Sequence, residues 1–212
     1  STFRGCSSLT EITIPDSVTS IGDSAFYGCT SLTEVTIPDG VTNIEGFVFT
    51  NTPWLIAKQE ENPLVIINGT LIDGTTCTGS VTIPDSVTSI AGGAFDSCTG
   101  LTAITIPESV TSIGDSAFYR CTGLTEIAIP ESATSIGNYA FDSCTNLTKI
   151  TIPDSITSIS DYAFRGCTGL KTITIPESVT TVGENAFSGC TGLTEITIPD
   201  SVTSIGDHVF DG

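Results

Sequence analysis

The chain has 212 residues, of which 39% are hydrophobic, and its 24 Asp and Glu against 6 Lys and Arg give a formal net charge of −18. The apolar fraction is ample for a folded core, whereas the negative charge disfavours polyanionic partners such as nucleic acids and anionic membrane surfaces. No apolar run approaches the roughly 20 residues of a bilayer-spanning helix, so we expect no membrane insertion. Because of the negative charge, we also expect no nucleic-acid binding.

A 23-residue repeat organises the chain. Proline recurs at this spacing, with one gap of two periods, at Pro15, Pro38, Pro84, Pro107, Pro130, Pro153, Pro176 and Pro199. Phenylalanine keeps the same period from Phe3 to Phe210, and cysteine keeps it from Cys6 to Cys190. The register survives the gap, so we expect a single solenoid domain over residues 1–212 with about nine 23-residue registers.

Each repeat predicts a short strand, an extended return and a turn. In one unit, Leu32, Val35 and Ile37 form an L-x-x-L-x-L segment whose last positions alternate, which is typical of a short strand. The S-V-T-S-I segment that follows the proline favours a second, looser sheet. The I-G-D-S-A-F segment predicts a turn and a single helical or 3₁₀ turn that points its Ala and Phe inward.

No such unit can bury its apolar face alone, whereas stacked units form continuous ladders of Leu, Ile, Phe and Cys. Parallel strands in neighbouring coils would lie about 4.8 Å apart. The sequence therefore predicts a mainly β solenoid, in which short parallel strands form a curved sheet and the returns form a second, looser one.

Residues 52–74 depart from the repeat, because Lys58 and Glu60 fall where the strand should be apolar. Residues 53–61 have helix-forming composition after a proline start, and the apolar runs around Asn68-Gly69 predict a β-hairpin. We expect this helix and hairpin to protrude from the solenoid or to cap over it. The segment is either a degenerate coil that tolerates an insertion or a docking element that carries Trp54.

The repeats resemble a known family. Segments such as LTEITIPDSVTSIGDSAFYGCTS and LTAITIPESVTSIGDSAFYRCTG are similar to the BspA-like bacterial leucine-rich repeats, with the pattern L-x-x-I-x-I-P-x-x-V-x-x-I-G-x-x-A-F-x-x-C. The resemblance covers nearly the whole chain and implies a leucine-rich-repeat fold on secreted or cell-surface proteins. It also implies adhesion to host extracellular proteins, co-aggregation or immune recognition, and no catalytic residues.

Seven of the eight cysteines form one column, and Cys77 lies off it. An odd column cannot pair internally, and parallel side chains in neighbouring coils rarely reach the dihedral angle of a disulfide. We therefore expect buried, reduced thiols that act as small hydrophobes, with an oxidised pair involving Cys77 as the alternative. Ligands in a straight line cannot close a tetrahedron, so we expect no metal site in this column.

The titratable residues predict no active site. The sole histidine, His208, occupies a variable position of the repeat, and no second histidine is available to activate a nucleophile. The carboxylates that follow each repeat proline form a solvated ladder rather than a converging pair. We expect no enzyme activity and no cofactor, although weak calcium association with the stacked carboxylates is an alternative to simple solvation.

The outward positions of the predicted strands define a candidate binding face on the concave side. They are mostly Thr with scattered charge and lack the aromatic and Arg anchors of strong interfaces, so stacking of Thr between strands explains them as well as binding does. With the tryptophan of the irregular register, the candidate binding residues are Glu11, Thr13, Glu34, Thr36, Trp54, Thr105, Glu126, Lys149, Thr151, Thr172, Thr174, Glu195 and Thr197.

Two functions follow from these observations. The first is an extracellular or cell-surface binding module, without catalysis, for host or bacterial proteins. The second is a structural spacer that displays another domain, which the near-identity of the units favours. Neither end carries a polar capping unit, so we expect a fragment of a longer array whose terminal repeats can stack end to end with another copy.

Overall fold

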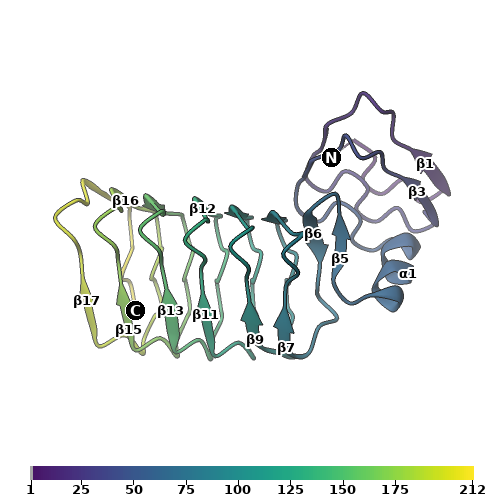
Figure 1. Ribbon diagram of the computed structural model, residues 1–212. Coiled ribbons are helices and arrows are strands. Elements are labelled where there is room, and N and C mark those ends of the chain that lie inside the picture. Colours follow the sequence, from purple (N-terminus) through teal and green to yellow (C-terminus); the bar gives the residue numbers. More distant parts are fainter. Residues whose placement is uncertain (1) are drawn as a thin grey trace.

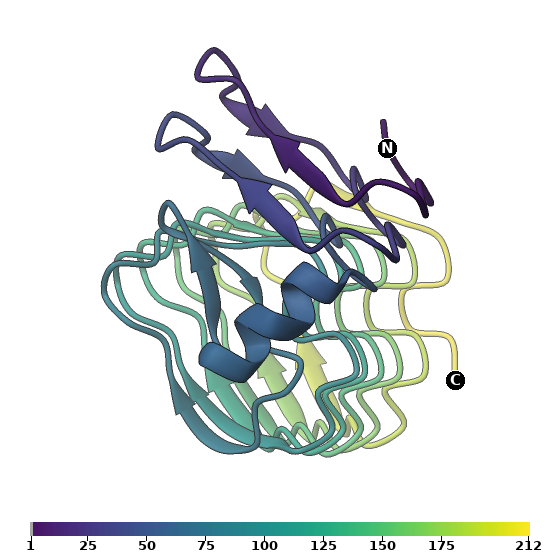
Figure 2. The same cartoon turned by 90° about the vertical axis from the view of Figure 1, so that its right-hand side faces the viewer.

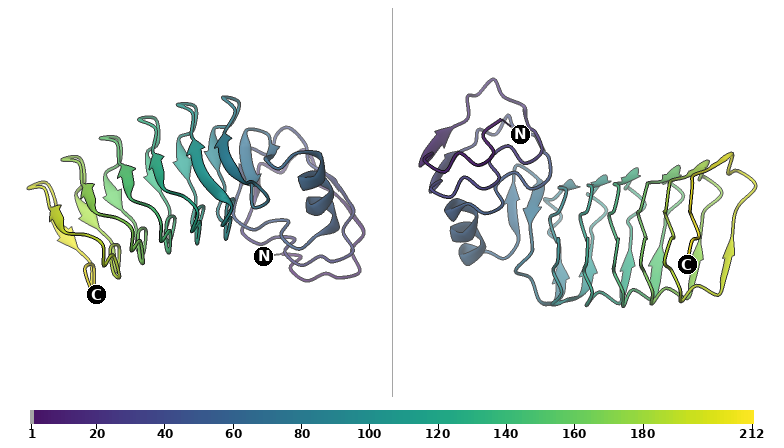
Figure 3. Two further views of the ribbon diagram at one scale, coloured as in Figure 1. Left: turned by 90° about the horizontal axis from the view of Figure 1, so that it is seen from below. Right: turned by 180° about the vertical axis from the view of Figure 1, so that it is seen from behind.

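The computed structural model describes residues 2–212 as a mainly β solenoid of about eight turns. In Figure 1 the coils from β7 to the C-terminus form one array, and the first two coils lie to one side of its end. Figure 3 shows the same offset from two further sides. Over residues 2–212, no helix is both long and apolar enough to cross a membrane.

The L-x-x-I-x-I segments form the first set of strands, as predicted. These are β1 (Glu11–Thr13), β3 (Glu34–Thr36), β7 (Gly79–Thr82), β9 (Leu101–Thr105), β11 (Glu126–Ala128), β13 (Lys149–Thr151), β15 (Thr172–Thr174) and β17 (Glu195–Thr197). They pair in parallel with the same strand of the next coil, in the orders β1-β3, β7-β9-β11-β13 and β15-β17.

The S-V-T-S-I segments form the second set, which is shorter. These strands are β2 (Ser20–Ile21), β4 (Asn43–Ile44), β8 (Ser89–Ile90), β10 (Ser112–Ile113), β12 (Ser135–Ile136), β14 (Ser158–Ile159), β16 (Thr181–Val182) and β18 (Ser204–Ile205). Their parallel register again advances by one repeat, so that Ser112 lies opposite Ser135.

The irregular register forms the predicted helix and hairpin. Helix α1 (Pro53–Glu61) begins after Thr52, whose Oγ1 accepts a hydrogen bond from the backbone N–H of Leu55 at 3.1 Å. Strands β5 (Val65–Ile67) and β6 (Thr70–Asp73) pair antiparallel. Asn68 and Gly69 both have positive φ, 47° and 80°, which gives the two-residue turn typical of tight hairpins.

The hairpin lies within the stack of coils and does not protrude from it. Strand β6 pairs in parallel with β8 and so extends the second sheet. The chain is apolar on both sides here. Leu64, Ile66 and Leu71 contact the core of the C-terminal array, whereas Val65, Ile67 and Ile72 contact the core of the first two coils. The segment therefore joins two cores, and α1 lies across the near end of the array (Figure 2).

Glycines at the junction let the second coil contact the array directly. The backbone N–H of Phe47 donates to the carbonyl of Gly92 at 3.3 Å, which skips the irregular register. A Cβ on Gly46 would lie 3.0 Å from Gly92, and a Cβ on Gly93 would lie 2.2 Å from the ring of Phe47. Since other units carry larger residues at these positions, the close contact depends on these departures from the repeat.

The phenylalanine column forms the centre of both cores. Successive rings stack nearly parallel with centroids 5.1 to 5.9 Å apart, from Phe3 to Phe49 and again from Phe95 to Phe210. At the junction Trp54 packs on Phe49 instead, with centroids 4.5 Å apart. Gly74 lies against Phe95, since a Cβ there would come within 2.3 Å of the ring.

The I-G-D-S-A-F segments form consecutive turns rather than a turn of helix. The backbone N–H of Ala25 donates to Gly22 and that of Tyr27 to Ser24, both at 3.2 Å. Ser24 between them has φ 55°, in the left-handed region, and this interrupts a helical path. Phe47, Tyr139 and Tyr162 occupy the equivalent position with φ between 56° and 59°.

Candidate binding surface

The predicted binding residues of the strands lie on one side of each strand and are exposed. This set, which we call the strand face, comprises Glu11, Thr13, Glu34, Thr36, Thr105, Glu126, Lys149, Thr151, Thr172, Thr174, Glu195 and Thr197. The pairing aligns them into columns, with Glu126 opposite Lys149 and Thr174 opposite Thr197. Each side chain is therefore presented at a position fixed by the strand register.

The strand face is not continuous, in contrast to the single face expected from the repeat. The part on β1 and β3 is separated from the part on β7 to β17, because in the described chain β3 neither pairs with β7 nor packs closely on it, whereas β13 and β15 remain in contact although they form no ladder. Figure 1 shows β1 and β3 displaced from the array, with α1 below β3 and beside the hairpin. The insertion of the irregular register is the physical cause, and one-dimensional periodicity does not reveal it.

A depression of about 250 Å³ lies in the strand face over β9, β11 and β13. Two alanines line it: Ala128 occurs where the other regular coils carry Thr, and Ala103 occurs where most of them carry Glu, Lys or Thr. The polar residues around it are Thr105, Glu126, Lys149 and Thr151. This is the part of the predicted face that could receive a side chain from a partner.

Trp54 does not belong to this surface. Its side chain is 8% exposed and packs on Phe49 within the core of the first two coils. The sequence left open whether this segment is a degenerate coil or a docking element that carries Trp54, and the structure buries the tryptophan itself in the core. Ile56, on the same helix, is 54% exposed instead.

A second surface, on the turns, was missed by the sequence reasoning. Tyr139 and Tyr162 stack with centroids 4.6 Å apart, and the guanidinium of Arg165 lies 5.6 and 5.1 Å from their rings. The hydroxyl of Tyr162 donates to Glu184 at 2.7 Å, and this hydrogen bond raises the pKa of Tyr162. Tyrosines one period apart, at a position usually held by small residues, were the available signal.

Arg165 also binds a buried carboxylate. Its Nη2 forms an ion pair with Oδ2 of Asp142 at 2.6 Å, and the side chain of Asp142 is fully buried. Burial disfavours the charged guanidinium, but the contact with Asp142 outweighs it, so the pKa of Arg165 is raised. The arginine is thereby held over the two tyrosine rings.

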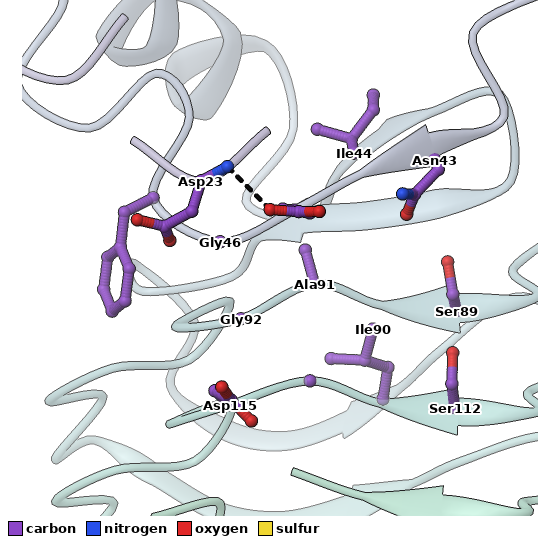
Figure 4. A pocket seen from close by; sticks show the side chains of 13 residues that line it. Asp23, Asn43, Ile44, Gly46, Ser89, Ile90, Ala91, Gly92, Ser112 and Asp115 are labelled. Carbon is purple, nitrogen blue, oxygen red and sulfur yellow. Dashed lines mark hydrogen bonds between the residues drawn. The ribbon is translucent and has the colours of Figure 1, made fainter. Parts of the chain in front are cut away.

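The junction between the two groups of coils contains a cavity on each side. The first, of about 300 Å³, is lined by the carboxylates of Asp23, Glu45 and Asp115, and Oε2 of Glu45 accepts a hydrogen bond from the backbone N–H of Asp23 at 2.8 Å (Figure 4). In the chain from residue 2 onward, no three potential ligand side chains are grouped to hold a metal ion.

The second cavity, which we call the junction cavity, has a volume of about 400 Å³. Residues from both groups of coils and from α1 line it: Tyr27, Phe47, Thr50, Asn51, Thr52, Leu55, Ile56, Gln59, Ile72, Asp73, Thr75, Gly93 and Asp96. Burial raises the pKa of Asp73, against hydrogen bonds from Gln59 and Thr75 that lower it. Its carboxyl is the buried titratable group of this cavity.

The coil geometry, the strand pairing and the Phe and Cys columns are those of a known repeat family. A model of the BspA type leucine rich repeat region matches in six copies, over residues 1–90, 65–190 and 134–212. The chain belongs to the BspA-type leucine-rich repeat family. Members of such repeat families are scaffolds for protein interaction, and this BspA-type chain has their architecture.

Solved bacterial structures are similar to this BspA-type chain. A leucine rich repeat protein of T. pallidum is 27% identical, with a TM-score of 0.57, over 92% of this chain and 72% of that one. Leucine-rich repeat proteins of Eubacterium ventriosum and Bacteroides ovatus are each 24% identical, with TM-scores of 0.62 and 0.50, over 99% of this chain and 78% of theirs. These last two show the fold alone. No match emerges among curated proteins.

Proposed function

We propose that this BspA-type repeat protein is a secreted or cell-surface binding module, without catalysis, that recognises extracellular host or bacterial proteins through its strand face. The depression over β9, β11 and β13 carries this proposal, because it is a concave feature on an otherwise regular surface. Glu126 and Lys149 at its edge give opposite charges on neighbouring strands, which would orient a polar partner.

The strand face favours modest affinity. Its residues are fixed by parallel pairing, so binding costs little ordering of the backbone. It lacks aromatic anchors, however, and such residues supply most of the binding free energy in strong interfaces. Several molecules displayed side by side, each with its own depression over β9, β11 and β13, would bind a multivalent partner with higher overall affinity through avidity.

Biolayer interferometry against immobilised fibronectin and fibrinogen tests this proposal at physiological salt. Ala128→Arg fills the depression from an exposed position, and Thr174→Arg adds the same charge to the same face two coils away. We expect saturable binding that falls at least about tenfold in the first variant and changes little in the second. No saturable signal at tens of micromolar, or equal loss in both variants, would refute it.

A spacer function is the second candidate, and the regular Thr columns favour it. Thr13 lies opposite Thr36, and Thr174 lies opposite Thr197, so stacking between strands accounts for much of the surface. For a spacer, we expect both arginine variants to leave every binding signal unchanged while a domain attached at one end keeps its own activity. Loss of partner binding in Ala128→Arg alone would count against this function.

End-to-end association with a second copy is proposed for either function. Phe3 and Phe210, the outermost rings of the column, are 38% and 44% exposed, and Ile205 of β18 is 51% exposed. Stacked coils would cover these side chains. Sedimentation equilibrium should show concentration-dependent self-association that Phe210→Asp abolishes, and a monomer at all concentrations would contradict it.

A further inference from the structure

The junction cavity contains a buried carboxyl group, that of Asp73, of which only one oxygen accepts hydrogen bonds from the described residues. Asp73 is 6% exposed, and its Oδ1 accepts hydrogen bonds from Nε2 of Gln59 at 2.8 Å, from the N–H of Thr75 at 3.1 Å and from the hydroxyl of Thr75 at 3.0 Å. No hydrogen bond reaches Oδ2 from residues 2–212. One side of this carboxylate is therefore fixed and the other is free.

The free oxygen keeps contact with solvent in the cavity. Among the described residues, the one fully buried side-chain oxygen or nitrogen without a hydrogen-bond partner belongs to Asp142. Oδ2 of Asp73 also has no such partner, so it must retain exposure, and Asp73 lines the junction cavity. Oδ2 is therefore the oxygen of Asp73 that is still available to a ligand.

No cation of the described chain neutralises this carboxylate. None of the residues that line the cavity is Lys or Arg, and Asp96 adds a second negative charge. Lys58 of α1 forms an ion pair with Glu61, in which Nζ lies 2.8 Å from Oε2. Arg4 lies over the ring of Tyr27, 4.7 Å from its centroid. Burial makes the ionised form of this carboxyl costly, and a cation bound beside it would lower that cost.

The rest of the lining suits a hydrocarbon chain that ends in a cation. Phe47 contributes an aromatic ring, and Leu55, Ile56 and Ile72 contribute aliphatic surface, whereas the ring of Tyr27 already holds the guanidinium of Arg4. An alkyl stem against the aliphatic side chains would place its charged end near Asp73. This combination is the one that a lysine side chain requires.

The hydrogen bonds already made by Asp73 distinguish lysine from arginine. A guanidinium binds a carboxylate best through two parallel hydrogen bonds, one to each oxygen. Oδ1 already accepts three hydrogen bonds, so that arrangement is not available. An ammonium is a compact charge and needs one oxygen only.

We propose that the junction cavity binds the side-chain ammonium of a lysine carried by a protein partner. Oδ2 of Asp73 accepts from the ammonium, and Phe47, Leu55, Ile56 and Ile72 contact the stem. This rests on the proposed function in that the partner is a protein, but it uses a different surface from the strand face. The two sites can therefore fail independently.

Nitrogen-15 NMR titration of the full chain at pH 7 tests the cavity directly. The probes are end-capped alanine pentapeptides with Lys, Arg or norleucine at the centre, and butylamine as a free amine. We expect the Lys peptide to shift the Gln59 side-chain amide and the Thr75 N–H, and to bind at least about tenfold more tightly than the norleucine and Arg peptides. Butylamine binding as tightly as the Lys peptide would assign the cavity to free amines and overturn a protein partner.

A pair of variants with the same change of charge completes the test. Asp73→Asn keeps the Oδ1 acceptor but places an amide donor where Oδ2 stands, whereas Glu60→Gln removes one exposed carboxylate of α1 outside the cavity. We expect Asp73→Asn to weaken Lys-peptide binding at least about tenfold and Glu60→Gln to leave it unchanged. Equal affinities in both variants, or shifts confined to residues outside the cavity, would overturn the proposal while leaving strand-face binding intact.

Discussion

The cysteine column combines apolar packing with hydrogen bonding. The thiol of Cys144 lies 3.1 Å from the carbonyl oxygen of Phe118 in the preceding coil, and that oxygen also accepts the backbone N–H of Cys121. The same contact recurs along the column. All eight cysteines are free, and all but Cys6 are buried. The expected buried thiols are thus present, but their role as donors could not be read from spacing.

Burial should make these thiols unreactive in the native protein. It raises the pKa of Cys98 and of Cys190 to about 11, so the reactive thiolate is scarce at pH 8. We expect Ellman's reagent to titrate one thiol, that of Cys6, in the native protein and eight after denaturation. Cys6→Ser should then give no native signal. Rapid reaction of two or more thiols in the native wild-type protein would contradict this prediction.

Asp73 predicts a pH dependence of stability with a defined sign. Because burial raises its pKa in the folded state, its contribution to stability is complete below the pKa of the unfolded chain and is lost as the pH rises through the folded pKa. Asp73→Asn removes that loss and keeps the Oδ1 acceptor. We expect its midpoint of urea unfolding to exceed the wild-type midpoint at pH 7, and the difference to shrink at pH 3.5.

The control for this prediction is Glu60→Gln, which removes an exposed carboxylate from the same helix. Its unfolding midpoint should follow that of the wild type at both pH values. A lower midpoint for Asp73→Asn at pH 7 would show that the ionised carboxylate stabilises the junction.

Within each coil, the repeated glycine of the I-G-D-S-A-F segment provides space rather than a left-handed conformation. The left-handed residue is Ser24 or its equivalent, two positions later. At Gly137 a Cβ would lie 2.4 Å from the backbone nitrogen of Asp115, in the preceding coil. At Gly137 a side chain would therefore have to displace backbone atoms of the neighbouring coil, although the next coil carries Ser160 at the same place in the repeat.

Gly137→Ala should accordingly destabilise the protein by about 1–3 kcal/mol, because backbone atoms of the adjacent coil must move. Gly40→Ala is the matched control, since its Cβ would meet its nearest atom, the carbonyl oxygen of Asp16, at 3.5 Å. We expect that variant to differ from the wild type by less than about 0.5 kcal/mol. Urea unfolding measures both, and similar losses in the two variants would contradict the steric account.

The elements themselves were largely predictable, and their contacts at the junction were not. Alternation around Val35 gives the strand, the proline start gives α1, and Asn68-Gly69 gives the hairpin turn. The burial of Trp54 depends on which surfaces the irregular register faces. Periodicity records which residues share a column, but it carries no information about a segment that joins two columns.

At the scale of the whole molecule, the apolar core has two parts. One contains buried residues from Ile14 to Val65, and the other contains those from Leu71 to Val209. They meet at the hairpin, which contributes side chains to both. In repeat proteins stability is approximately a sum of terms for each unit and its neighbours, so the smaller part should be less stable.

Hydrogen exchange should reveal this difference. We expect backbone amides of residues 11–44 to exchange at least about tenfold faster than those of residues 112–182, because the first two coils have fewer neighbours to stabilise them. Residues 112–182 serve as the internal reference, since each of those coils lies between two others. Equal protection in the two ranges would indicate that the hairpin couples both parts into one cooperative unit.

The irregular segment is one repeat long, so its deletion could bring the first two coils into line with the others. Residues 52–74 span one period, and Thr52 and Thr75 occupy the same place in the repeat as the column cysteines. Excision of these residues would join Asn51 to Thr75 without changing the phase of any ladder, and Gly46 already touches Gly92. Small-angle scattering of this deletion variant should then show one continuous array. The irregular segment would thus be the element that displaces the first two coils from the others.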